Sequence, residues 1–254
     1  MNKKVMVAVL PVIFLGLLLI GCQPSAALPE SEDILFQYST LGSLSAGVFD
    51  GNITYTELKT RGDFGLGTFN ALDGEMIEVD HQVYQIKSDG VVYPVDGNLK
   101  SPFAVVTHFE ADQTIQVVEP MDCTQLRSYL DTLLPTENIP YAIKVTGIFS
   151  AMQARSVPRQ EKPYPPLADV VKIQSVFEFK DVEGVMVGFR LPDYMDIVNA
   201  PGYHFHFITA DRRAGGHVLD CKAQKVTVEI DNTGEWHAVL PEDDAFYKLD
   251  LAPD

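Results

Sequence analysis

The amino-acid sequence predicts an α+β protein in which mixed and antiparallel β-sheets dominate and helices are few. Short apolar runs alternate with turn residues along most of the chain, which is typical of strands. Only the segment after Asp122 keeps apolar residues at helical spacing over a long stretch. Two strand–turn–strand segments, one near residue 70 and one near residue 210, are compatible with two similar sheet halves but do not make a repeat.

The N-terminal half is expected to be mainly strands and turns. Asp73-Gly74 stands between two apolar runs and is a strong hairpin signal. Asp122 predicts the start of a helix that runs to about Leu134 and ends at Pro135. We expect further strands at 35–38, 82–86, 91–93, 104–109, 114–118 and 141–149.

The C-terminal half follows a proline-rich segment at 156–166, which we interpret as an ordered loop. We expect a short helix at 167–173, a turn at 181–184 and a closing helical turn at 241–247. Strands are predicted at 175–179, 185–191, 204–210, 217–222, 225–230 and 236–240. The predicted organisation is an N-terminal sheet half at 34–166 and a C-terminal sheet half at 167–254.

Composition restricts the class of protein. Apolar residues make up 46% and charged residues 21% of the chain, which indicates a globular protein rather than a disordered one. The net charge is −16, and this excess of acid disfavours nucleic acid and anionic membrane surfaces as partners.

The N-terminus has the pattern of a bacterial lipoprotein signal. Lys3 and Lys4 precede an apolar run at 5–20, and Gly21-Cys22 follows it directly. We expect a signal peptide at 1–21, lipidation of Cys22 and a flexible Pro/Ser-rich tether at 22–33. The domain would then lie outside the cytoplasm and contact the membrane only through its lipid anchor. A simple signal peptide or an uncleaved anchor helix is the alternative.

Two further cysteines, Cys123 and Cys221, remain after that cleavage. They could pair in an exported protein, but two cysteines in a domain of this size do not form a disulfide framework. We therefore expect free buried thiols.

The most informative stretch is YHFHFITADRRAGGHVLD at 203–220. Side chains alternate along a strand, so His204 and His206 should face one side and Phe205 the other. A turn at 211–216, polar at first and ending in Gly215-Gly216, should bring His217 beside them.

Three neutral imidazoles without a cysteine suit a catalytic zinc site on this C-terminal hairpin. The spacing alone also suits iron, manganese, copper or nickel, and each histidine singly could be a hydrogen-bonded core residue.

Three segments are similar to the α-acetolactate decarboxylases. They are GDFGLGTFNALDGEMI (62–77), SAMQARSVPRQEKPYPPL (150–167) and APGYHFHFITADRRAGGHVLD (200–220), and the similarity extends from about residue 35 to about residue 251. The resemblance implies a two-part sheet fold, a homodimer and one zinc per chain. It also implies that (S)-2-acetolactate loses CO₂ to give (R)-acetoin through an enediolate that the metal stabilises, followed by protonation on one face.

The resemblance also implies roles for particular residues. His204, His206 and His217 match the zinc ligands, Glu75 and Arg155 match catalytic residues, and Thr68 matches a residue that lines the substrate pocket. Composition alone would single out none of the last three. The family commonly has a C-terminal tail with a glutamate near the metal, and residues 251–254 of this chain are expected to be too short to supply it.

Two other functions fit the histidine pattern. A cupin-like metal oxygenase also uses H-x-H with a distant histidine, and it would use iron and oxygen. A surface lipoprotein that binds a metal or a small acid without turnover would need the histidines but not Glu75 or Arg155. The match around Arg155 favours the decarboxylase over both.

Overall fold

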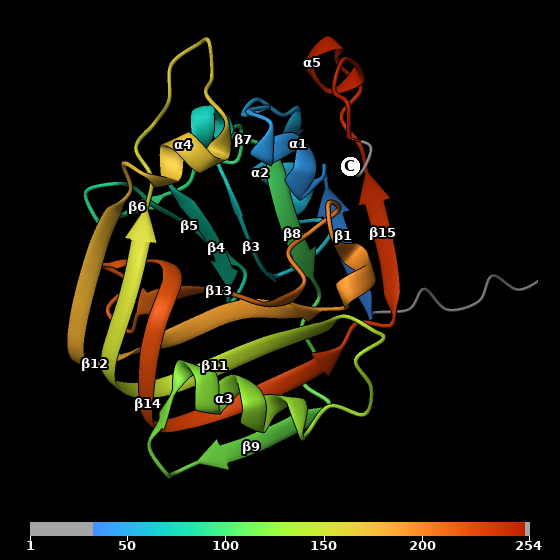
Figure 1. Cartoon of the computed structure of the whole chain (residues 1–254). Helices are drawn as coiled ribbons and strands as arrows, with labels where there is room; N and C mark the ends of the chain where they lie inside the picture. Colours follow the sequence, from blue (N-terminus) through green and yellow to red (C-terminus); the bar gives the residue numbers. More distant parts are fainter. Residues whose placement is uncertain (1–32, 252–254) are drawn as a thin grey trace, which may run out of the picture. The chain divides into compact units, whose positions relative to one another are not determined.

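Two β-sheets dominate the computed structural model, which describes residues 33–251 (Figure 1). The first has seven strands. β15 is parallel to β1, and the other neighbours are antiparallel. In spatial order the strands are β15 (Glu235–Val239), β1 (Ile34–Tyr38), β8 (Phe103–Thr107), β3 (Phe64–Thr68), β4 (Glu75–Val79), β5 (Gln82–Ile86) and β6 (Val92–Pro94).

The second sheet has longer, antiparallel strands. A further pairing between β13 and β14 closes the path β14-β11-β12-β13 into a ring. The strands in order are β10 (Met121–Asp122), β14 (Gly215–Asn232), β11 (Tyr141–Ser156), β12 (Ser175–Leu191) and β13 (Gly202–Thr209), and β9 (Gln113–Val117) also pairs with β14. A small separate sheet joins β2 (Ile53–Thr54) and β7 (Lys100–Ser101).

Helices are short in the described residues. The longest is α3 (Cys123–Asp131), whose N-cap Asp122 forms a reciprocal capping box with Gln125, as the sequence predicted for its start. The others are α1 (Leu41–Ser45), α2 (Tyr55–Leu58), α4 (Leu167–Val171), α5 (Asp244–Tyr247) and the 3₁₀ helices η1 (Asn70–Leu72) and η2 (Asp193–Met195). No helix among residues 33–251 has the length and apolar character needed to cross a membrane.

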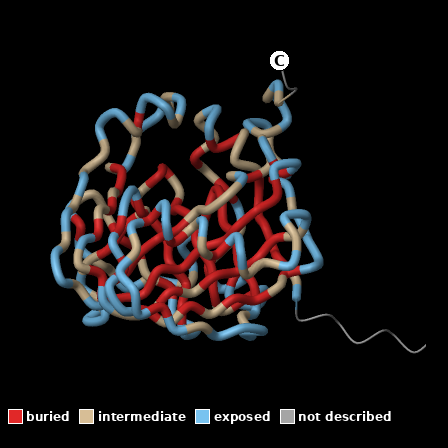
Figure 2. Tube along the Cα trace, turned by 60° about the horizontal axis from the view of Figure 1, so that its bottom comes forward, coloured by how far each residue is buried: buried red, intermediate tan, exposed pale blue. Residues whose placement is uncertain are grey.

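Buried apolar side chains form three clusters. Figure 2 shows the buried residues along the strands in the interior. The first lies between the sheets and combines Leu66 and Ile77 of one with Phe189 and Ile208 of the other. The second includes side chains of the closed ring of strands and the buried residues of α3. The third contains Tyr55 of α2 with side chains of the first sheet. The fold is therefore mostly β with few helices, as predicted.

Two local expectations differ from the structure. The expected turn at 181–184 is part of β12, which pairs continuously with β11 apart from a local irregularity near Asp181. Asp181 takes a left-handed φ of 49°, so the strand bends there without ending. The two predicted strands at 217–222 and 225–230 are likewise one strand, β14.

Cys123 and Cys221 form a disulfide, so the expectation of free thiols was wrong. The bond joins the first residue of α3 to β14 across 98 residues of sequence, with 4.9 Å between the Cα atoms. Packing of α3 against β14 creates this proximity, which composition could not indicate.

The division of the chain between the two sheets does not fall at residue 166, where the sequence analysis placed it. Strand β11 lies before the proline-rich loop, but it pairs with β12 and β14. Strand β15 returns from the C-terminal part of the chain to pair with β1. The reason is long-range pairing, because β11 finds both of its partners later in the chain.

Candidate active site

Three imidazoles meet on neighbouring strands of the second sheet. His204 and His206 lie on β13 and face the same side, whereas Phe205 lies in the core cluster of the closed ring, as strand alternation predicted. His206 is directly opposite His217 of β14. One nitrogen from each ring lies within 4.8 Å of the others, and the ring centroids are 4.9–5.2 Å apart.

Gly216 allows this arrangement. Its φ is 146°, and a Cβ there would lie 2.5 Å from the carbonyl oxygen of Arg155. A side chain at this position would therefore separate β14 from β11. The glycine lets His217 lie directly opposite Arg155 on the neighbouring strand.

The three histidines are held neutral. Burial, and to a smaller extent the positive charge of Arg155, lowers the pKa of all three, to about 4 for His204. His206 Nδ1 lies 2.8 Å from the carbonyl oxygen of Met76, which can only accept a hydrogen bond, so Nδ1 carries the proton. That leaves Nε2 of His206 with a free lone pair.

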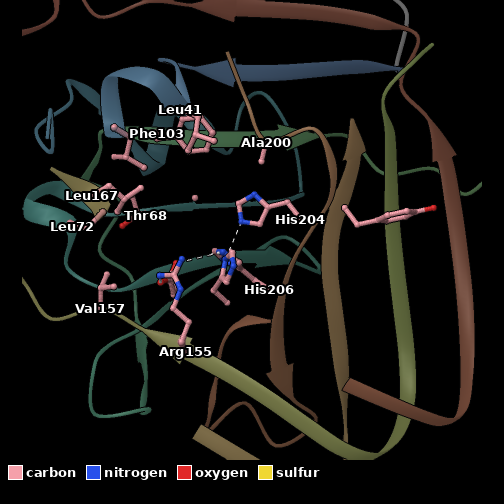
Figure 3. Close-up of a pocket in the computed structure, with 15 residues that line it drawn as sticks. Leu41, Thr68, Leu72, Phe103, Arg155, Val157, Leu167, Ala200, His204 and His206 are labelled. Atoms are coloured by element: carbon pink, nitrogen blue, oxygen red, sulfur yellow. Dashed lines mark hydrogen bonds and ion pairs between the residues drawn. The ribbon is translucent and has the colours of Figure 1, made fainter. Parts of the chain in front are cut away.

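An ion pair from the two sheets lies beside the histidines. Arg155 Nη1 on β11 donates to Glu75 Oε1 on β4 at 2.6 Å. The other carboxylate oxygen of Glu75 is 3.5 Å from His206 Nε2. Burial raises the pKa of Glu75, and the guanidinium of Arg155 opposes this shift. Figure 3 shows Arg155, His204 and His206 pointing toward one another.

Thr68 ends β3 next to this group. Its hydroxyl donates to the carbonyl of Gly74 at 2.6 Å, which ties β3 to the turn immediately before Glu75. Its own carbonyl accepts hydrogen bonds from the buried hydroxyls of Tyr55 and Ser101. Thr68 therefore contributes to the pocket lining and also holds the backbone that carries Glu75.

The side chains border a cavity of about 310 Å³. All six residues singled out in the sequence line it, so the structure brings the whole set together. Sequence reasoning missed the apolar wall, because its residues come from short helices, loops and the start of β8, with no shared periodic pattern. That wall consists of Leu41, Leu44, Leu72, Phe103, Val157, Leu167 and Ala200 (Figure 3).

The fold and the pocket together define a class: a β-rich enzyme whose reactive groups come from both sheets. The model of the family "Alpha-acetolactate decarboxylase" matches residues 35–253. A relative of that name from Methanosarcina mazei is 52% identical over 222 residues, covering 87% of this chain and 77% of the relative. Another, from Methylococcus capsulatus, is 50% identical over 227 residues, covering 89% and 86%.

Solved structures agree with these relatives. The crystal structure of α-acetolactate decarboxylase from Bacillus subtilis strain 168 superposes with a TM-score of 0.85 at 39% identity, covering 87% of this chain and 94% of that one. A Staphylococcus aureus protein of unknown function, described as similar to this enzyme, gives a TM-score of 0.83 at 32% identity, covering 85% and 94%. The chain therefore belongs to the α-acetolactate decarboxylase family and is a carboxy-lyase that acts on acetolactate.

Proposed function

We propose that this pocket converts (S)-2-acetolactate to (R)-acetoin and CO₂ with a zinc ion held by His204, His206 and His217. The observation that carries the proposal is the convergence of three neutral imidazoles beside an Arg–Glu pair in one buried cavity. Family membership favours this reaction over an oxygenase or a passive binding function.

The donor set fits zinc. Neutral imidazole nitrogens are good ligands for this ion, and three protein ligands leave a coordination position open, which is typical of catalytic sites. The contact from His206 to the Met76 carbonyl is the kind of outer hydrogen bond that orients a ligating ring. When bound, the ion would supply Lewis-acid stabilisation of the negative charge that develops as CO₂ leaves.

Arg155 is placed to orient the substrate. Its guanidinium is always protonated and can form two parallel hydrogen bonds to a carboxylate. Its side chain is only 14% exposed, so the attraction is weakly screened. We assign to Arg155 the binding of the substrate carboxylate and of the anion that remains after the C–C bond breaks.

Glu75 lies where it can donate the proton that replaces CO₂ on the substrate. Loss of CO₂ leaves an electron pair on the former α-carbon, and one proton must be added there to give acetoin. A guanidinium is a poor acid, whereas burial raises the pKa of the Glu75 carboxyl group and so favours its protonated form, which can donate a proton. Delivery from Glu75 alone would protonate one face, which accounts for a single enantiomer.

The test is acetoin formation from racemic 2-acetolactate by the soluble domain that begins after Cys22. We expect (R)-acetoin by chiral chromatography, loss of activity with a chelator and recovery when zinc is restored. Zinc and iron should be compared in parallel, with oxygen uptake recorded. Full activity of metal-free protein would contradict the zinc proposal, and a racemic product would contradict delivery of the proton to one face.

We propose that the enzyme is exported and anchored by lipid on Cys22, with no other membrane contact. The signal and the tether lie outside the described residues. The Cys123–Cys221 disulfide supports an oxidising location, since such bonds are rare in the cytoplasm. Metabolic labelling with a fatty acid tests the anchor, and a Cys22→Ala protein should lose the label.

We also propose a homodimer, as the resemblance implies. Light scattering of the purified soluble domain tests this, and a monomeric mass at micromolar concentration would contradict it.

A further inference from the structure

A buried pair of amides, Gln37 and Asn199, lies at one edge of the pocket. Gln37 is 0% and Asn199 1% exposed. Asn199 Nδ2 donates to Gln37 Oε1 at 2.8 Å, and Gln37 Nε2 donates to the carbonyls of Ser39 and Val198, each at 2.8 Å. Both N–H groups and the carbonyl of Gln37 are therefore used, so this contact has a single favourable arrangement.

This pair of amides holds helix α1 in place. The helix has five residues, too few to hold its own conformation without tertiary contacts. Its first N–H groups donate across the pocket edge, from Leu41 to the carbonyl of Val198 at 2.9 Å and from Gly42 to that of Ile197 at 2.8 Å. The carbonyl of Val198 thus accepts from both Gln37 and Leu41, which links the amide pair directly to the helix.

The backbone on both sides of this contact is strained. Ser39 has a φ of 67° and Ile197 a φ of 70°, although neither is glycine and Ile197 is β-branched. A Cβ on Gly42 would lie 3.0 Å from Ile197 Cγ2, so α1 packs against this segment as closely as a glycine permits. Strained conformations persist only where surrounding contacts hold them, and the amide pair supplies such contacts.

The strained segment carries part of the pocket wall. Leu41 and Leu44 of α1 line the cavity, as does Ala200, whose N–H donates to Asn199 Oδ1 at 2.8 Å. Figure 3 shows Leu41 and Ala200 on the same side of the pocket, with Ala200 next to His204.

We propose that Gln37 and Asn199 are positioning residues that hold the wall of Leu41, Leu44 and Ala200 against the substrate. The wall would enclose the alkyl groups of acetolactate and keep water from the reacting carbon. This inference rests on the proposed function of the pocket. It adds two residues that contact neither the substrate nor the histidines and that act through α1.

The test compares Asn199→Ala with Gly42→Ala, which disturbs the same contact while leaving both amides in place. We expect Asn199→Ala to raise KM for 2-acetolactate about tenfold, the effect of one buried polar group left unpaired, with a smaller change in kcat. Gly42→Ala should raise KM in the same direction, because its added Cβ lies 3.0 Å from Ile197 Cγ2 and displaces α1. Calorimetric Kd for 2-hydroxy-2-methylpropanoate, an unreactive hydroxy acid, should rise by the same factor. Zinc content should stay at the wild-type value.

Tyr141→Phe is the matched control. It removes a hydroxyl that donates to the Thr136 carbonyl at 2.7 Å, and Tyr141 does not line the pocket. It should lower thermal stability and leave KM unchanged. The inference is overturned if the folded variants keep KM and Kd within twofold of wild type, or if Tyr141→Phe raises KM equally. If Asn199→Ala does not fold, Asn199→Asp takes its place, because it keeps the size of the side chain and removes the donor to Gln37 Oε1.

A wild-type protein that binds no hydroxy acid and forms no acetoin would instead contradict the proposed function.

Discussion

Replacing Glu78 by glutamine should remove much of the loss of stability that wild type shows as pH rises toward about 8. Glu78 lies on β4, is 0% exposed, and neither of its carboxyl oxygens has a hydrogen-bond partner in the described part of the chain. Burial raises its pKa from 4.5 to about 8; Lys59 opposes the shift and Asp63 adds to it.

The sign of the effect follows from these values. The folded state keeps the proton up to about pH 8, whereas the unfolded chain releases it near 4.5. The unfolded state therefore binds fewer protons between these values, and stability falls as pH rises through this window. The full difference of about 3.5 pKa units corresponds to roughly 5 kcal/mol, of which about 3 kcal/mol is lost between pH 6 and pH 9.

The assay is urea unfolding of zinc-loaded wild type and Glu78→Gln at pH 6, 7, 8 and 9. Glutamine does not titrate, so the variant should gain about 3 kcal/mol relative to wild type across this range. Asp231, whose pKa burial raises to about 7, titrates in both proteins and cancels in the difference. Glu119→Gln, at an exposed position, is the control and should follow wild type. A difference between Glu78→Gln and wild type that stays constant within about 1 kcal/mol would refute the assignment of a proton to Glu78.

Three other changes test the site and the fold. His206→Ala should lose zinc and activity together, measured by metal analysis and acetoin formation; retained activity in zinc-free protein would disprove the ligand role. Arg155→Ala should keep its zinc and lose about 100-fold or more in kcat/KM, whereas Arg159→Ala, at an exposed side chain, should not; equal rates for the two would remove Arg155 from the reaction. Replacing Cys123 and Cys221 by serine should lower the free energy of unfolding by about 2–5 kcal/mol with kcat unchanged; equal urea midpoints in oxidised and serine forms would contradict a native bond.

Elements that depend on neighbours in sequence were predicted well. The strand predicted at 82–86 has the same bounds as β5, and α3 begins after its predicted cap, Asp122. The two histidines of β13 face one side, as alternation required. Each of these features is decided by strand periodicity or by capping within a few residues, so the local sequence contains the needed information.

Elements that depend on distant partners were predicted less well. The turn expected at 181–184 rested on local polarity, but pairing with β11 keeps that segment in a strand. The disulfide and the place where the sheets exchange strands likewise depend on which segments pack together. Patterns among residues that are close in sequence do not determine such long-range contacts.

The sequence by itself determined the β-rich class, the helix cap and the three histidines of one hairpin, and its resemblance to a family indicated Glu75 and Arg155. Only the tertiary structure placed those two side chains, 80 residues apart in sequence, in an ion pair that joins the two sheets. It alone revealed that Gln37 meets Asn199 across 162 residues. Strand and helix periods act over a few residues, whereas these contacts arise when two independently paired sheets bury their facing side chains against each other.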